Sequence, residues 1–213
     1  MALQLGKNPW ILISLVFLET LFIFIPALIS SKIENKAIKK ILFEMGFQKN
    51  EDVIIKIIAG VSIGVLFFVI GDFIIIFFRD LIIKNLLGSG FVETGQEGTI
   101  DTSPVQPSLI QMVILIILQI VIIGPCEEAF FRGFLIKKAK SEVKVVYLII
   151  ISSSLFAFYH VPPFLVPLAT TITFFGYYFT FGILLALIFI YFDYSLIPCL
   201  IAHSSFNIIL LLI

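Results

Sequence analysis

Charged residues are scarce in this sequence. Only 13% of its 213 residues are Asp, Glu, Lys or Arg, whereas 60% are hydrophobic, and its mean hydropathy is +1.16. This composition excludes an ordinary soluble domain and is typical of a polytopic membrane protein, whose immediate partner is the lipid bilayer. Because acidic and basic residues balance to a formal net charge of zero, the charge does not favour nucleic acid as a partner.

Several features that would indicate other classes of protein are also missing. The two cysteines, Cys126 and Cys199, both lie in apolar runs, so no disulfide framework is implied. The absence of a Gly-x-Ser-x-Gly motif leaves a serine nucleophile with little support. The absence of His-Glu-x-x-His excludes a zincin-type helix. Without an internal repeat, a small transporter also has little support.

The apolar residues gather in six segments, each of which predicts a transmembrane helix. We therefore expect an all-α integral membrane protein, a bundle of about six transmembrane helices with its functional candidates on the last four. The six segments are Pro9–Ile29, Val53–Phe78, Leu109–Lys140, Val145–His160, Leu168–Phe192 and Leu196–Ile213.

Two polar segments separate the first three spans. Ser31–Met45 has a capping-box pattern and four lysines, which predicts either a basic amphipathic helix on an anionic surface or a solvated connector. Arg79–Ser108 is rich in Gly, Thr and acidic residues and predicts a loop. We divide the chain into residues 1–108, with the first two spans, and residues 109–213, with the functional candidates. The lysine-rich connections, after spans one and three, are expected in the cytosol, with both termini outside.

The most informative stretch runs from Gly124 to Gly133 and reads GPCEEAFFRG. Ionised groups at the end of an apolar run cost at least a few kcal/mol each and are kept for pairing or for chemistry. On a helix, Glu128 and Arg132 are four residues apart and predict an ion pair. Glu127 points about 100° away from that pair and is therefore available for a reaction. Pro125 removes a backbone donor one turn earlier, which weakens the helix beside the acids.

The chain has only two histidines, and both lie in apolar helical contexts. His160 ends the run FAFYH, and His203 shares a helix face with Asn207, four residues later. A buried carboxylate and two imidazoles on different helices suit water-mediated hydrolysis. Glu127 could take the proton of a water with help from His160. His203 and Asn207 could donate hydrogen bonds to the oxyanion.

The same side chains raise the question of a cofactor. Glu127, His160 and His203 also form a ligand set known from catalytic zinc sites, so a divalent zinc ion is the alternative to a metal-free reaction. Arg132 places a fixed positive charge one helical turn from the site, which opposes a dication and slightly favours the metal-free reaction unless Glu128 neutralises that charge.

Asp72 raises a different class of protease. An aspartyl intramembrane protease would carry Gly-x-Gly-Asp, but residue 69 is Val, and Asp193 follows Phe rather than Tyr. The aspartyl mechanism therefore has little support.

Three motifs in order on successive apolar helices resemble the CPBP family of CAAX proteases and bacteriocin-processing enzymes, also called the Abi family. They are Glu-Glu-x-x-x-Arg (Glu127, Glu128, Arg132), Phe-x-x-x-His (Phe156, His160) and His-x-x-x-Asn (His203, Asn207). The resemblance covers about Leu109–Ile213 and extends to type II CAAX prenyl endopeptidases.

This resemblance implies an intramembrane endopeptidase, labelled in the family either as a metalloprotease or as a glutamate-dependent enzyme without metal. It implies that Glu127 and His160 activate water, and that His203 and Asn207 form the oxyanion site. The implied substrates are prenylated CAAX proteins or, in the cell membrane of a prokaryote, bacteriocin or pheromone precursors. The alternative is a non-catalytic immunity or scaffold protein of the same family. Residues 1–108 match no motif.

Overall fold

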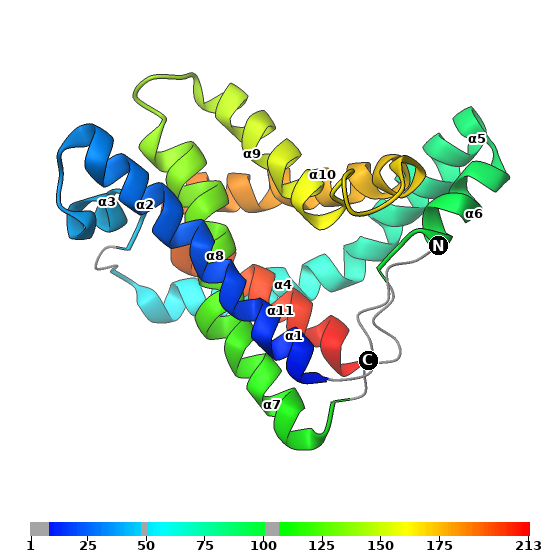
Figure 1. Ribbon diagram of the computed structural model, residues 1–213, viewed down its shortest axis with the longest axis horizontal. Helices are drawn as coiled ribbons and strands as arrows, with labels where there is room; N and C mark the ends of the chain where they lie inside the picture. The colour runs from blue at the N-terminus through cyan, green and yellow to red at the C-terminus, as the bar shows by residue number, and fades with distance from the viewer. Residues whose placement is uncertain (1–8, 48–50, 101–106) are drawn as a thin grey trace.

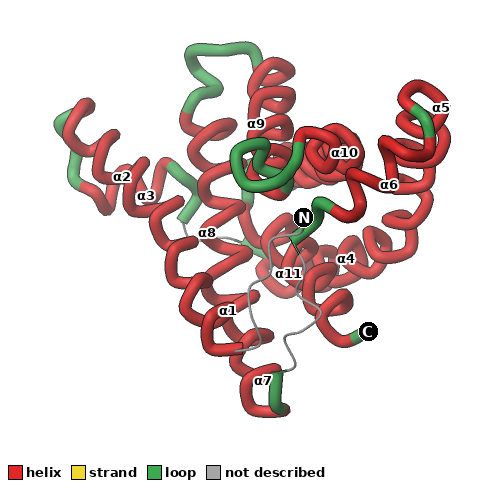
Figure 2. The backbone as a smooth tube through the Cα atoms, turned by 45° about the vertical axis from the view of Figure 1, so that its right-hand side comes forward, coloured by secondary structure: helices red, strands yellow, loops and turns green. Residues whose placement is uncertain are grey.

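A computed structural model describes residues 9–47, 51–100 and 107–213. Over these residues the chain forms helices joined by turns and short loops, with no strand (Figures 1 and 2). The predicted all-α membrane bundle is confirmed.

The helices follow one another closely along the chain. The α-helices are α1 Pro9–Val16, α2 Leu21–Glu34, α3 Ile38–Glu44, α4 Val53–Ile75, α5 Lys84–Leu87, α6 Ser89–Glu97, α7 Leu109–Leu118, α8 Gly124–Glu128, α9 Val145–His160, α10 Leu168–Tyr191 and α11 Leu196–Leu212. A 3₁₀ turn, Phe17–Thr20, joins α1 to α2, and π-helical segments occupy Ile76–Ile83, Gln119–Ile123 and Ala129–Lys138.

Within the described residues, four continuous helical stretches are long and apolar enough to cross a membrane. They are Ile13–Glu34, Val53–Leu87, Leu109–Lys138 and Leu168–Tyr191. The other two predicted spans, α9 and α11, are apolar but shorter. The chain is therefore a multi-pass membrane protein in which two shorter helices complete the bundle.

The prediction of a loop over Arg79–Ser108 is wrong for much of this segment. The helix begun by α4 continues to Leu87, and α6 follows directly. Gly88, at φ +88°, makes the break between them, in a conformation that glycine adopts without cost. Gly95 of α6 lies so close to Thr173 of α10 that a Cβ would clash. The Gly- and Thr-rich composition therefore serves close helix packing. Residues 101–106 of the predicted loop lie outside the described part.

The predicted single helix over Ser31–Met45 is also wrong. α2 continues through Glu34 and ends at Asn35, which adopts the left-handed conformation of a helix cap. Only α3 then follows before Gly46. Ile41 of α3 and Met45, the residue directly after α3, are fully buried inside the protein, so this helix packs against the bundle.

Close helix contacts bring the later helices around α8. α4 lies along α11, where Gly64 faces the backbone of Ala202. α10 lies along α9, where Gly182 faces Ser153. Small residues at such contacts allow helices in a membrane to approach each other closely. These contacts position the helices that carry the two histidines.

Candidate active site

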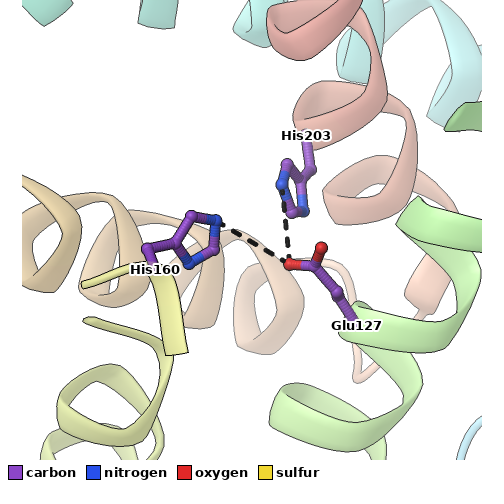
Figure 3. A group of neighbouring side chains, drawn as sticks. All are labelled: Glu127, His160 and His203. Carbon is purple, nitrogen blue, oxygen red and sulfur yellow. Dashed lines mark ion pairs between the residues drawn. The ribbon is translucent and has the colours of Figure 1, made fainter. Parts of the chain in front are cut away.

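Three side chains from three helices converge on one point (Figure 3). Glu127 comes from α8, His160 from the end of α9 and His203 from α11. Glu127 Oε2 lies 4.0 Å from His160 Nε2 and 3.9 Å from His203 Nε2. One donor atom of each residue lies within 4.8 Å of the other two. Glu127 and His203 are buried, and His160 is partly exposed.

The helix that carries the two glutamates is irregular on both sides. The π-helical segments Gln119–Ile123 and Ala129–Lys138 flank α8, and such segments often occur at functional sites. Pro125 stands at the start of α8. The Ser204 hydroxyl of α11 donates a hydrogen bond of 3.0 Å to the Gln119 carbonyl, within the first π-helical segment. This bond ties the distorted stretch to the helix that bears His203.

The predicted pair of Glu128 and Arg132 is present and fully buried. Arg132 Nη1 lies 3.1 Å from Glu128 Oε1, and Arg132 Nη2 donates to the Gly182 carbonyl of α10 at 3.1 Å. The guanidinium also lies over the Phe156 ring, 4.7 Å from its centroid. One cation therefore connects the segment after α8 to α9 and α10.

The hydrogen bonds of the two imidazoles define which nitrogen faces the site. His203 Nδ1 lies 2.8 Å from Glu128 Oε1, and His160 Nδ1 lies 2.9 Å from the Phe156 carbonyl. Both partners are acceptors, so each Nδ1 carries the proton and donates. Each Nε2 is left facing Glu127. An imidazole oriented in this way is typical of catalytic and metal-binding histidines.

The convergence point has the donor atoms to hold a small ligand. Glu127 Oε2 is buried and has no hydrogen-bond partner among the described residues. A water with hydrogen bonds of about 2.8 Å holds partners about 4.0–4.6 Å apart, which matches the observed spacing. Zinc bonds of about 2.0–2.2 Å would place two ligand atoms about 3.3–3.5 Å apart, so the same donors would have to move closer by about half an ångström. In type and number, however, the donors fit a catalytic zinc site with an open position.

A cavity of about 200 Å³ opens beside this point. Both histidines and Asn207 line it, and the rest of its lining is apolar or aromatic. The His160 ring stacks on Tyr178, with centroids 4.7 Å apart. The cavity therefore offers a polar end formed by the histidines and Asn207, and an apolar body suited to a hydrophobic ligand.

Residues 109–209 match the family model described as type II CAAX prenyl endopeptidase Rce1-like. Over this segment the chain is similar to the CPBP family of CAAX proteases. Neither a curated protein nor a solved structure matches the chain. The matched segment contains all six residues predicted for the site: Glu127, Glu128, Arg132, His160, His203 and Asn207.

A contact from outside the matched segment was missed by sequence analysis. The Tyr159 hydroxyl donates a short hydrogen bond to Glu19, in the 3₁₀ turn between α1 and α2. Tyr159 adjoins His160, so the first helix reaches the edge of the site. Glu19, an acid within an apolar span, was the available signal, but nothing in the sequence indicates a partner so far along the chain.

The structure gives no support to an aspartyl dyad. Asp72 lines a pocket with Tyr177 and Phe206, whereas Asp193 lines a different pocket with Lys56 at the far end of α10. The two carboxylates do not share a site.

Proposed function

We propose that this protein is an intramembrane endopeptidase that hydrolyses peptide bonds of membrane-associated substrates. One observation carries the proposal. An unpartnered carboxylate oxygen of Glu127 faces the Nε2 atoms of His160 and His203 inside an apolar bundle. Buried ionisable groups are expensive in a membrane, and a set aimed at one point is best explained by chemistry at that point.

The charges around the site suggest its protonation state. Glu127 and Glu128 are two carboxylates, and Arg132 offsets one of them. A proton on His203, which lies between both carboxylates, makes the cluster neutral overall. His203 Nε2 then donates a hydrogen bond to the bridging water, while that water donates to Glu127 and to His160 Nε2. Each hydrogen-bonding atom at the centre is satisfied in this arrangement.

This arrangement supplies the steps of hydrolysis. The water oxygen attacks the carbonyl carbon of the peptide, and its proton passes to Glu127, with His160 orienting the water. The negative charge on the carbonyl oxygen is stabilised by hydrogen bonds from His203 and Asn207. The carbon–nitrogen bond then breaks, and the proton held by Glu127 passes to the leaving amine. Glu128 and Arg132 do not contact the reacting atoms and act by fixing His203.

A divalent ion is the alternative way to satisfy the same donors. Glu127, His160 and His203 would hold it. The ion would polarise a bound water and the peptide carbonyl. The roles of Glu128 and Arg132 as positioning residues are the same in either case, because they act on His203.

The proposed substrates are hydrophobic or lipidated peptides, either prenylated CAAX proteins or membrane-associated precursor peptides. The family match and the aromatic lining of the cavity, with Phe156, Tyr178 and Phe181, both support this class. A soluble, highly charged substrate would have to leave water for an apolar cavity, at a large cost in free energy.

The proposal is tested with purified protein in liposomes and two sets of peptides, one prenylated at a C-terminal CAAX sequence and one hydrophobic without a lipid. Mass spectrometry detects the cleavage products. We expect cleavage by the wild-type protein and none above background by His160→Phe, which keeps a ring to stack on Tyr178 but has no nitrogen. Failure of the wild-type protein to cleave any peptide, or undiminished cleavage by His160→Phe, would contradict the proposal.

A further inference from the structure

Asp72 is a carboxylate within an apolar helical stretch. It lies in the continuous stretch Val53–Leu87, about 28 Å along the helix from Val53 and about 22 Å from Leu87. A bilayer core is about 30 Å thick, so this stretch is longer than the core and Asp72 lies about two helical turns before the ion pair of Arg79 and Asp80. An acid within a membrane-spanning helix is rare and marks a functional site by default.

No described residue forms an ion pair with this carboxylate. Within the described part of the chain, Asp72 forms neither a hydrogen bond nor an ion pair, and its side chain is exposed. The other acid of this helical stretch, Asp80, is neutralised by Arg79 at 2.7 Å. The proposed function gives Asp72 no role, and no packing contact requires a charge there.

The position of Asp72 relates it to the candidate active site. It lines a pocket of about 210 Å³ that shares four residues with the cavity beside His160 and His203. The shared residues are Tyr177, Tyr178, Phe206 and Leu210. Tyr178 is also the ring on which His160 stacks. The two pockets are thus neighbours separated by a common aromatic wall, and a peptide in one can place a side chain in the other, because each extended residue spans about 3.3–3.6 Å.

We propose that Asp72 binds a cationic group of the peptide substrate, a few residues from the bond that is cut. The inference rests on the proposed function and adds a specificity-determining residue to it. A lysine or arginine side chain or a free N-terminal amine would supply the missing countercharge. The aromatic rings of Tyr177 and Tyr178 would contact the apolar stem and attract the cation. A substrate with such a group gains an interaction that a wholly apolar peptide of the same length lacks.

The test measures binding rather than cleavage, using Glu127→Gln protein in nanodiscs. The probes are fluorescent, N-acetylated hydrophobic peptides that carry one lysine at successive positions, and matched peptides with norleucine or glutamate instead. A third peptide has a free N-terminal amine and no lysine, so the two sources of positive charge are distinguished. At one position, we expect lysine or the free amine to tighten binding about tenfold, the order of one partly desolvated charge pair. Asp72→Asn should remove the preference, and Asp72→Lys should reverse it in favour of glutamate.

Asp80→Asn is the matched control, because it also removes a carboxylate from the same helical stretch but should keep the preference. If Asp72→Asn misfolds, the inference is tested by comparing how tightly the lysine and glutamate peptides bind to protein in which Asp72 is intact. Equal binding of lysine, norleucine and glutamate peptides, no binding of any peptide, or a preference unchanged in Asp72→Asn would overturn the inference. Absence of cleavage by wild-type protein would overturn only the proposed function.

Discussion

His203 Nδ1 lies 2.8 Å from Glu128 Oε1, although the two residues are 75 positions apart in the chain. The same carboxylate oxygen accepts a hydrogen bond of 3.1 Å from Arg132 Nη1. Glu128 therefore joins a structural ion pair to a histidine of the candidate active site. Its neighbour Glu127, directed to another face of the helix, meets the opposite side of the same imidazole. Adjacent glutamates thus have separate tasks, one orienting His203 and the other facing the reaction.

Replacing Glu128 should affect both stability and reaction rate. Glu128→Gln removes the charge that offsets Arg132 and weakens the bond that orients His203. We expect a lower melting temperature in detergent and a roughly 10–100-fold lower rate in the protein that stays folded. Melting curves and cleavage rates on the same purified sample separate the two effects. A variant with wild-type values in both measurements would rule out the positioning role.

Arg132→Ala should be strongly destabilising. It leaves Glu128 buried and unpaired and removes the bond to the Gly182 carbonyl, for an expected loss of about 3–5 kcal/mol. Arg79→Ala is the control, because its pair with Asp80 is partly exposed and should be worth about 0–1 kcal/mol. Thermal or denaturant unfolding in detergent compares the two. Equal losses of stability would contradict the structural role of Arg132.

The parts of this molecule that depend on local sequence could be predicted. Long apolar runs predict the transmembrane helices, because a segment that crosses the bilayer core must be apolar and must pair its backbone groups internally. Helical spacing predicts the pair of Glu128 and Arg132. The helix from Arg79 to Leu87 could not be predicted from composition, because its charges and the glycines after it favour a loop. In the structure, Arg79 pairs with Asp80 and Gly95 packs against α10, so long-range packing outweighs composition.

The cross-helix contacts could not be predicted in the same way. Nothing local to His203 indicates that it donates a hydrogen bond to Glu128, and nothing local to Glu19 indicates that Tyr159 donates a hydrogen bond to it. Such partners depend on how far each helix is shifted along its neighbour. Hydropathy limits that shift only to within a few residues. Close contacts such as Gly64 with Ala202 determine it.

Activity should survive removal of metal ions. The spacing of Glu127, His160 and His203 already suits a bridging water, whereas zinc would require these donors to move closer by about half an ångström. We expect protein washed with a chelator to contain no stoichiometric metal by elemental analysis and to keep its cleavage rate. Zinc present at one ion per chain, with activity lost on its removal and restored on its return, would establish the metal-dependent alternative.

A surface ion-pair network at one end of the bundle should make stability depend on pH. Hydrogen bonds from Lys138 at 2.8 Å and Lys36 at 2.9 Å hold the pKa of Glu44 below its usual value of 4.5. A carboxylate whose pKa is lower in the folded state stabilises the fold above its unfolded pKa, and the contribution disappears as the pH falls through the folded pKa. The free energy of unfolding of the wild type should exceed that of Glu44→Gln by at most about 1 kcal/mol. This difference should shrink below about pH 4.5. Melting curves at several pH values measure it, and a constant or growing difference on acidification would contradict this sign.

The central claim is that Glu127 is the general base, and its most direct test is the rate of peptide cleavage by purified, folded Glu127→Gln. Glutamine keeps the size and the hydrogen-bonding capacity of the side chain but cannot take the proton of the attacking water. We predict a melting temperature close to that of the wild-type protein and a rate lower by at least about 10²–10⁴-fold. Near-normal cleavage by Glu127→Gln would contradict the account and exclude Glu127 as the base.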